Sequence, residues 1–230
     1  MKLCGLQKMT LLDYPGKVAC TVFTGGCDLR CPFCHNALLV TELDEAEEIG
    51  EEKLFSLLNK RKGILDGVAV TGGEPLLQPD IIPFLEKIKA LGYAVKLDHN
   101  GTRPALLKEI IDRKLVDYVA VDVKNCREKY GITAGVPDIA LEPFEKTVDL
   151  LLSGNVPYEF RTTIVREFHD VEDIGKIGQW ITGAENYFLQ NFVDSGNLIG
   201  ENMHPVEKET LLLMKAEAEK YVKNVGIRGV

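Results

Sequence analysis

Segments with the pattern of strands alternate with segments with the pattern of helices along most of this 230-residue chain. The predicted strands are short runs rich in apolar, β-branched and aromatic residues, and the predicted helices carry apolar residues at helical spacing. Strands are expected at 18–23, 67–71, 94–98, 118–124, 158–165 and 186–190. Helices are expected at 53–62, 80–91, 104–114, 141–152, 170–180 and about 205–222. Six alternations of this kind predict an α/β fold with a parallel sheet and right-handed crossovers.

The composition indicates one globular domain over residues 1–230, without an internal repeat, a low-complexity segment or a linker. The net charge is −8 and no basic stripe is present, so nucleic acid is not an expected partner. No apolar run approaches the roughly 18 residues of a membrane span, and residues 1–17 lack the features of a secretory signal. We therefore expect a cytoplasmic protein that is not associated with a membrane.

Three cysteines, Cys27, Cys31 and Cys34, lie within eight residues in the loop 25–36 that follows the first predicted strand. Thiolates at this spacing can share one metal centre. A cubane iron–sulfur cluster is normally held by four cysteines, so three leave one iron without a protein ligand. An open position on a metal can bind a substrate-like molecule, as in other catalytic metal sites.

The same loop allows two other interpretations. Cys27, Cys31, Cys34 and His35 together have the ligand types of a structural zinc site on an interaction module. The three thiols can also be unrelated to one another. The context of the loop has to separate these hypotheses.

Polar groups follow the next three predicted strands at their ends. The turn Gly72-Gly73-Glu74-Pro75 ends the second strand, Asp98 ends the third, and Asp122 with Lys124 ends the fourth. Glycine permits a close approach of the backbone that other residues deny. The carboxyl ends of parallel strands meet at one rim, where α/β folds place their sites, so we expect these groups beside the cysteine loop.

The cysteine spacing resembles the cluster loop of the radical S-adenosylmethionine enzymes. The segment from Leu11 to Cys27, with its Asp13-Tyr14-Pro15-Gly16-Lys17 turn, is similar to the activating proteins of anaerobic ribonucleoside-triphosphate reductase. Those proteins form part of the glycyl-radical-activase branch. The resemblance covers nearly the whole chain and implies an open partial (β/α)6 barrel, since six units are too few for the full eight-stranded barrel.

The resemblance implies that Cys27, Cys31 and Cys34 hold a [4Fe–4S] cluster whose free iron chelates S-adenosylmethionine. It implies that the Gly72-Gly73-Glu74 turn binds the amino group of this cofactor, for which carbonyl and carboxylate oxygens are suitable acceptors. It also implies that three residues lie around the ribose and carboxylate of the cofactor: Asp98, Asp122 and Lys124. In some relatives these acids also hold a monovalent cation. The alternative for Asp122 and Lys124 is a surface ion pair of little energetic value.

Three further positions are of interest. Arg161 alternates with apolar neighbours and is expected to point into the barrel, where a buried arginine needs an anionic partner. That partner is either the bound cofactor or an internal carboxylate. By position in the family, Gln190 is expected near the nucleoside. His99 stands where the resemblance predicts a threonine, and we assign no role to it or to the acidic segment 42–52.

The activity implied by the resemblance is reductive cleavage of S-adenosylmethionine to a 5′-deoxyadenosyl radical, with an electron from a flavodoxin or ferredoxin. The radical would then remove a hydrogen atom from a backbone glycine of anaerobic ribonucleoside-triphosphate reductase. The alternatives are activation of a formate-lyase-like glycyl-radical enzyme, radical chemistry on a small molecule, and the zinc-binding interaction module.

Overall fold

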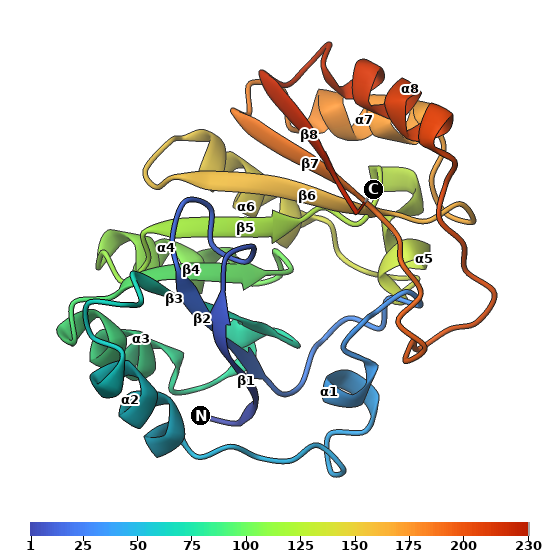
Figure 1. The fold of residues 1–230 in the computed structure, drawn as a ribbon. Coiled ribbons are helices and arrows are strands. Elements are labelled where there is room, and N and C mark those ends of the chain that lie inside the picture. Colours follow the sequence, from blue (N-terminus) through green and yellow to red (C-terminus); the bar gives the residue numbers. More distant parts are fainter. Residues whose placement is uncertain (230) are drawn as a thin grey trace.

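The fold is organised around one curved sheet in which eight strands follow their order in the chain (Figure 1). The computed structural model describes residues 1–229. The strands are β1 (Leu3–Thr10), β2 (Ala19–Thr24), β3 (Gly67–Gly72), β4 (Ala94–His99), β5 (Tyr118–Asp122), β6 (Tyr158–Ile164), β7 (Asn186–Asn191) and β8 (Asn224–Arg228). β1 pairs with β2 in antiparallel register, and every later pair of neighbours is parallel.

Helices connect the parallel strands and cover the outer face of the sheet (Figure 1). They are α1 (Ala37–Thr41), α2 (Glu51–Lys60), α3 (Ile81–Ala90), α4 (Pro104–Asp112), α5 (Tyr130–Ala134), α6 (Glu142–Leu152), α7 (Val171–Trp180) and α8 (Lys208–Ala218). Two short 3₁₀ turns, η1 (Pro75–Leu77) and η2 (Arg127–Lys129), follow β3 and β5. None of the helices in residues 1–229 combines the length and the apolar character that crossing a lipid bilayer requires.

The α/β class and the parallel sheet predicted from the sequence are confirmed. All six predicted strands are present in the predicted order, and the ladder does not join β1 to β8 within the described residues, which leaves the barrel open. Two strands, β1 and β8, were not predicted and extend the sheet at its two edges. The predicted helix at about 205–222 is shorter at both ends. Glu207 has an extended backbone with ψ of 152°, and after Ala218 the chain turns toward β8.

Side chains alternate between the two faces of the sheet, as the period of a strand requires. On β4, Val95 and Leu97 are buried in the apolar core, whereas Lys96 and Asp98 form an ion pair in the barrel interior. Charged interior residues recur on β6, where Glu159 is buried and forms a bidentate pair with Arg228 of β8. The barrel therefore has an apolar outer layer and a polar interior.

Candidate functional site

A cavity of about 250 Å³ lies at the carboxyl ends of the parallel strands and brings together nearly all of the predicted site residues. The predicted residues that line it are Cys27, Cys31, Cys34, Gly72, Gly73, Asp98, Asp122, Lys124, Arg161 and Gln190. They come from the loop after β2, from the carboxyl-terminal parts of β3, β4, β5 and β7, from Gly73 and Lys124 just after β3 and β5, and from Arg161 in the middle of β6. The predicted site residues therefore do lie together at one rim. Glu74 is the exception, because it does not line the cavity.

The cysteine loop is held against the β3 turn by backbone hydrogen bonds. The Gly73 N–H donates to the Thr24 carbonyl at 2.8 Å, and the Glu74 N–H donates to the Gly26 carbonyl at 2.7 Å. A Cβ atom on Gly73 would lie 2.1 Å from the Gly26 oxygen, so only glycine allows this approach. The Asn36 side chain adds a third link by donating to the Gly72 carbonyl at 2.8 Å. These contacts fix the loop relative to the sheet.

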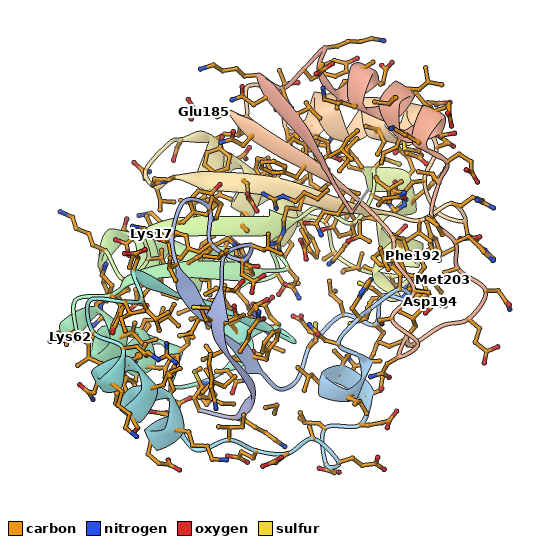
Figure 2. All side chains as sticks on the ribbon, in the orientation of Figure 1. Lys17, Lys62, Glu185, Phe192, Asp194 and Met203 are labelled. Carbon is orange, nitrogen blue, oxygen red and sulfur yellow. The ribbon has the colours of Figure 1, made fainter. Side chains whose placement is uncertain are left out.

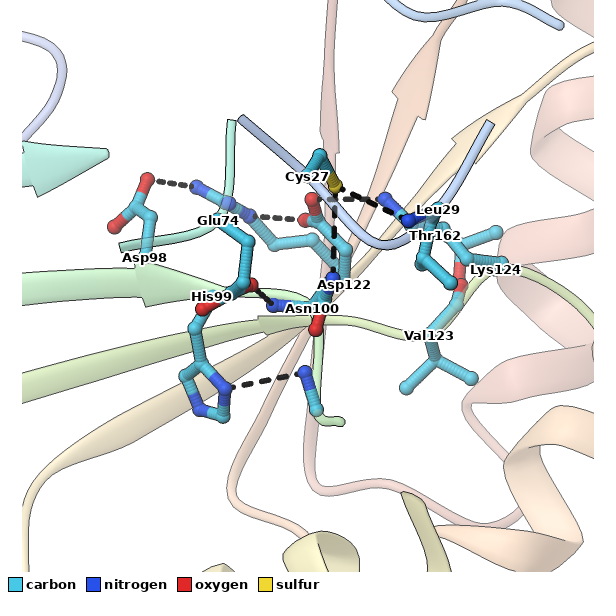
Figure 3. A network of polar contacts seen from close by, with 12 residues as sticks. Cys27, Leu29, Glu74, Asp98, His99, Asn100, Asp122, Val123, Lys124 and Thr162 are labelled. Carbon is cyan, nitrogen blue, oxygen red and sulfur yellow. Dashed lines mark hydrogen bonds and ion pairs between the residues drawn. The ribbon is translucent and has the colours of Figure 1, made fainter. Parts of the chain in front are cut away.

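Glu74 is fully buried and does not line the cavity. Its Oε1 accepts from the Leu76 N–H at 2.8 Å. Its Oε2 accepts from the Asn100 N–H at 2.7 Å (Figure 3). Burial raises the pKa of this carboxyl to about 8, although both N–H groups oppose the rise. Its side chain thus joins the turn after β3 to the turn after β4, and only the two glycines of the motif face the cavity.

Asn100 is a site residue that the sequence analysis left without a role. Its side-chain nitrogen donates to Asp28 at 2.7 Å. The same nitrogen lies 3.7 Å from the Cys27 sulfur (Figure 3). The Leu29 N–H donates to the same sulfur at 3.4 Å. Hydrogen bonds to ligand sulfurs are one of the means by which a protein sets a cluster potential. Its position in the sequence could have identified it, because Asn100 directly follows a strand that ends in charged and polar residues.

Asp98 and Asp122 are joined by Arg161 across three neighbouring strands. The Arg161 Nη1 donates to Asp98 at 2.8 Å, and its Nε donates to Asp122 at 2.9 Å. Lys96 pairs with the other oxygen of Asp98, and Lys124 pairs with the other oxygen of Asp122 at 3.2 Å. Arg161 therefore points into the barrel as predicted and has internal carboxylates as partners.

The charges of this group are mutually stabilised despite their burial. Burial alone would raise the pKa of Asp122, but Arg161 and Lys124 hold that pKa below its ordinary value. Burial likewise opposes the charged form of Lys124, while Asp122 raises the pKa of the ammonium group above its usual range. Asp122, Lys124 and Arg161 are thus all ionised at neutral pH. The ion pair of Asp122 and Lys124 is therefore not the exposed surface pair of the alternative interpretation.

His99 lies beside this group but makes no ionic contact. Its Nδ1 accepts from the Gly101 N–H at 3.1 Å (Figure 3). Among the buried side-chain nitrogen and oxygen atoms of residues 1–229, only the His99 Nε2 lacks a hydrogen-bond partner. Burial lowers the pKa of the ring to about 4, so the imidazole is neutral at pH 7.

The segment after β7 packs beside the cysteine loop. The Gly200 N–H donates to the Pro32 carbonyl at 2.8 Å, and the rings of His35 and Phe192 meet edge to face with centroids 5.6 Å apart. Figure 2 labels Phe192, Asp194 and Met203 of this segment. Apolar residues of the loop, Leu29 and Phe33, also line the cavity. The cysteines therefore lie in surroundings from which much of the solvent is excluded.

The arrangement of the cysteines fits a cluster better than a zinc ion. Within residues 1–229 no group of three or more His, Cys, Asp and Glu side chains converges on a single metal ion. A closed zinc site needs such convergence, with ligands at about 2.0–2.3 Å from one ion. A cubane instead presents separate irons to its thiolates. Burial raises the pKa of Cys27 to about 12, so this thiol would lose its proton only when a metal replaces it.

Comparisons of the sequence with protein-family models and with curated proteins point to the same family. A model of the Radical SAM superfamily matches residues 21–181. A Methanocaldococcus jannaschii protein with the provisional name of glycyl-radical enzyme activating enzyme is 34% identical over 98% of this chain and 95% of its own length. The pyruvate formate-lyase-activating enzyme of Clostridium pasteurianum is 30% identical over 80% of this chain and 78% of its own.

A solved structure shows the likeness in fold. A domain of the pyruvate-formate lyase-activating enzyme from Bacteroides vulgatus superimposes with a TM-score of 0.56 at 21% identity. The superposition covers 71% of this chain and 99% of that domain.

Proposed function

This chain belongs to the radical S-adenosylmethionine superfamily and, within it, to the glycyl-radical enzyme activating enzymes, and from this membership we propose that it generates a glycyl radical on anaerobic ribonucleoside-triphosphate reductase. The superfamily uses a [4Fe–4S] cluster and S-adenosylmethionine. When bound together, these groups supply a 5′-deoxyadenosyl radical after an external donor provides one electron. We propose a flavodoxin or a ferredoxin as that donor.

The observation that carries the proposal is the shared cavity at the strand ends. Cys27, Cys31 and Cys34 line it from one side, and they are the residues that would hold the cluster. Thiolate is the usual ligand of such clusters, and the chain offers three in this loop, so one iron stays open for the cofactor. The buried surroundings of the loop support chemistry that must be kept away from water.

S-adenosylmethionine would lie across the rest of the cavity. The backbone of Gly72 and Gly73 lines the cavity and suits the amino group of the cofactor, and the Lys124 ammonium suits its carboxylate. Asp122 and Gln190 line the same space and would face the ribose and nucleoside. Glu74 would act as a positioning residue, because both of its oxygens already bind backbone N–H groups.

The proposed reaction needs only the external electron donor and the partner protein as further reactants. One electron from the donor would break the bond between the sulfur and C5′ of S-adenosylmethionine and release methionine. A hydrogen atom would then pass from the Cα of the partner glycine to the 5′ carbon, which would give 5′-deoxyadenosine and leave the unpaired electron on the glycine.

The choice of the reductase is supported by the segment Asp13 to Lys17 and its resemblance to reductase-activating proteins. A second candidate is a formate-lyase-like partner. It is favoured by the 30% identity to a pyruvate formate-lyase-activating enzyme over most of both chains.

Electron paramagnetic resonance distinguishes the two partners. The anaerobically reconstituted protein is reduced with S-adenosylmethionine in the presence of either a purified anaerobic reductase or a formate-lyase-like enzyme. The proposal expects a glycyl doublet with the reductase and release of 5′-deoxyadenosine. A doublet with the lyase alone would transfer the assignment to the second candidate, and no doublet with any reductase would refute the first.

A further inference from the structure

The two acids at the ends of β4 and β5 have no carboxylate oxygen free of a protein cation. Asp98 uses one oxygen for Lys96 and the other for Arg161 at 2.8 Å. Asp122 uses one oxygen for Arg161 at 2.9 Å and the other for Lys124 at 3.2 Å. Arg161 alone touches both acids, through two different nitrogens of its planar guanidinium group.

This set of side chains carries more positive than negative charge. Three cations face two carboxylates, and the side chains of Lys96, Arg161 and Lys124 are only 2%, 14% and 15% exposed. Screening by solvent is weak at such burial, so a further cation would meet repulsion as well as occupied ligands. The next carboxylate, Glu159, is 3.9 Å from Arg161 and already forms a bidentate pair with Arg228.

The residues present therefore do not fit a bound alkali-metal cation. Such an ion takes several oxygen ligands with available lone pairs, as other hard cations do. Within residues 1–229 no group of three or more candidate side chains converges on a single ion. The guanidinium group of Arg161 occupies the space between the two acids that a cation would need.

We propose that Arg161 replaces the monovalent cation that some relatives hold between the corresponding acids. The fork of the guanidinium group bridges Asp98 and Asp122 and fixes both carboxylates at the rim of the cofactor cavity. The protein is then independent of potassium and sodium. Only the consequence for S-adenosylmethionine binding rests on the proposed function, because the ion pairs exist without the cofactor.

The test compares potassium, sodium and tetramethylammonium chlorides at equal ionic strength. The anaerobically reconstituted protein is measured for its melting temperature without S-adenosylmethionine and for its affinity for S-adenosylmethionine. For the unmodified protein both readouts are expected to be the same in the three salts, within about twofold for affinity. A saturable stabilisation by potassium or sodium that tetramethylammonium does not give would overturn the proposal.

Arg161→Ala is expected to create a cation requirement. The variant frees one oxygen of Asp98 and one of Asp122, which potassium or sodium can then bridge. The freed oxygens accept charge-assisted contacts from the ion, so we expect affinity for S-adenosylmethionine to rise about tenfold or more when tetramethylammonium is replaced by potassium or sodium. The melting temperature without the cofactor should rise in the same salts. Indifference of this variant to the salts would contradict the proposal.

Two further variants complete the design. Arg166→Ala removes an exposed arginine just beyond β6, which pairs with Glu207 at the surface, and it should remain indifferent to the salts. If Arg161→Ala does not fold, Arg161→Lys keeps a charge but reaches one acid at a time, and it should show the same dependence in weaker form, about threefold. Equal values in all salts for Arg161→Lys would then count against the proposal. Failure of the unmodified protein to bind S-adenosylmethionine would instead refute the proposed function, and the melting temperatures would still decide this inference.

Discussion

At the scale of single residues, Glu74→Ala tests the positioning role of Glu74. The change leaves the buried N–H groups of Leu76 and Asn100 without an acceptor, and each unsatisfied group costs about 1–3 kcal/mol. We expect urea unfolding of the cluster-free protein to show a loss of about 2–4 kcal/mol. Glu86→Ala, at an exposed position on α3, should stay within about 0.5 kcal/mol of the unmodified protein. Equal effects of the two substitutions would argue against the role in positioning.

Most residues of the site were predictable because each motif follows a strand. Residue types and positions placed the cysteines, the two glycines, Asp122 and Lys124 at one rim, and all of them line the cavity. The direction of a side chain within a turn was not predictable. The Glu74 side chain binds two backbone N–H groups of the neighbouring turns, and Asn100 approaches the Cys27 sulfur through a contact between segments far apart in the sequence.

His99 gives the protein a predicted dependence on pH. The pKa of its ring is about 4 in the folded protein, against an ordinary value of 6.5. The unfolded chain therefore binds a proton between these values that the folded chain does not, so stability falls as pH drops from 6.5 to 4. Between pH 7 and 5 this group should account for a loss of about 2 kcal/mol.

His99→Asn isolates that contribution. Asparagine can accept from the N–H two residues ahead, as His99 does from Gly101, but it does not titrate in this range. Urea unfolding at pH 7 and pH 5 should show that the variant loses about 2 kcal/mol less than the unmodified protein over this interval. An unchanged pH dependence would show that other groups, such as the buried His169, control it.

At the scale of elements, the strands with strong apolar patterns were predicted from the sequence. β1 and β8, whose apolar patterns are weak, were not predicted. β8 has only five residues, and a Cβ on its central Gly226 would lie 2.6 Å from the Phe188 ring, so a larger residue there would have to displace this ring. β1 contains irregular register shifts against β2 and three consecutive exposed residues, Gln7 to Met9. β1 lacks the alternation that identifies a strand, and in β8 the alternation is limited to two apolar residues, Val225 and Ile227, which is too short to be distinctive. Both are stabilised by contacts with distant parts of the chain.

A local sequence signal is sufficient to determine the start of α7. Asp170 accepts from the Asp173 N–H and Asp173 accepts from the Asp170 N–H, which is the capping box that two such residues three positions apart can form. Asp170→Ala should therefore lower the free energy of unfolding by about 1 kcal/mol, and Asp170→Asn, which can still cap, should lower it much less. Chemical denaturation measures both. A loss of similar size in the two variants would assign the effect to the ion pair with Lys129 instead.

At the scale of the whole molecule, the winding of the sheet makes the site. Each strand from β2 to β7 lies next to the one that follows it in the chain, so consecutive strand ends form a continuous rim around the cavity. The alternation of strands and helices in the sequence is sufficient to predict this continuous rim. The identity of the partner is a property of surfaces and loops, and no periodicity in the sequence reports on it.

Anaerobic reconstitution with iron and sulfide, followed by metal analysis and electron paramagnetic resonance with and without S-adenosylmethionine, tests the central claim most directly. We expect a brown protein with about four irons and four sulfides per chain, and a spectrum of the reduced cluster that changes when S-adenosylmethionine binds. Cys31→Ala should lose the iron and keep the fold by circular dichroism. Zinc in place of iron, a cluster with four protein ligands that ignores S-adenosylmethionine, or full iron content in Cys31→Ala would contradict the account.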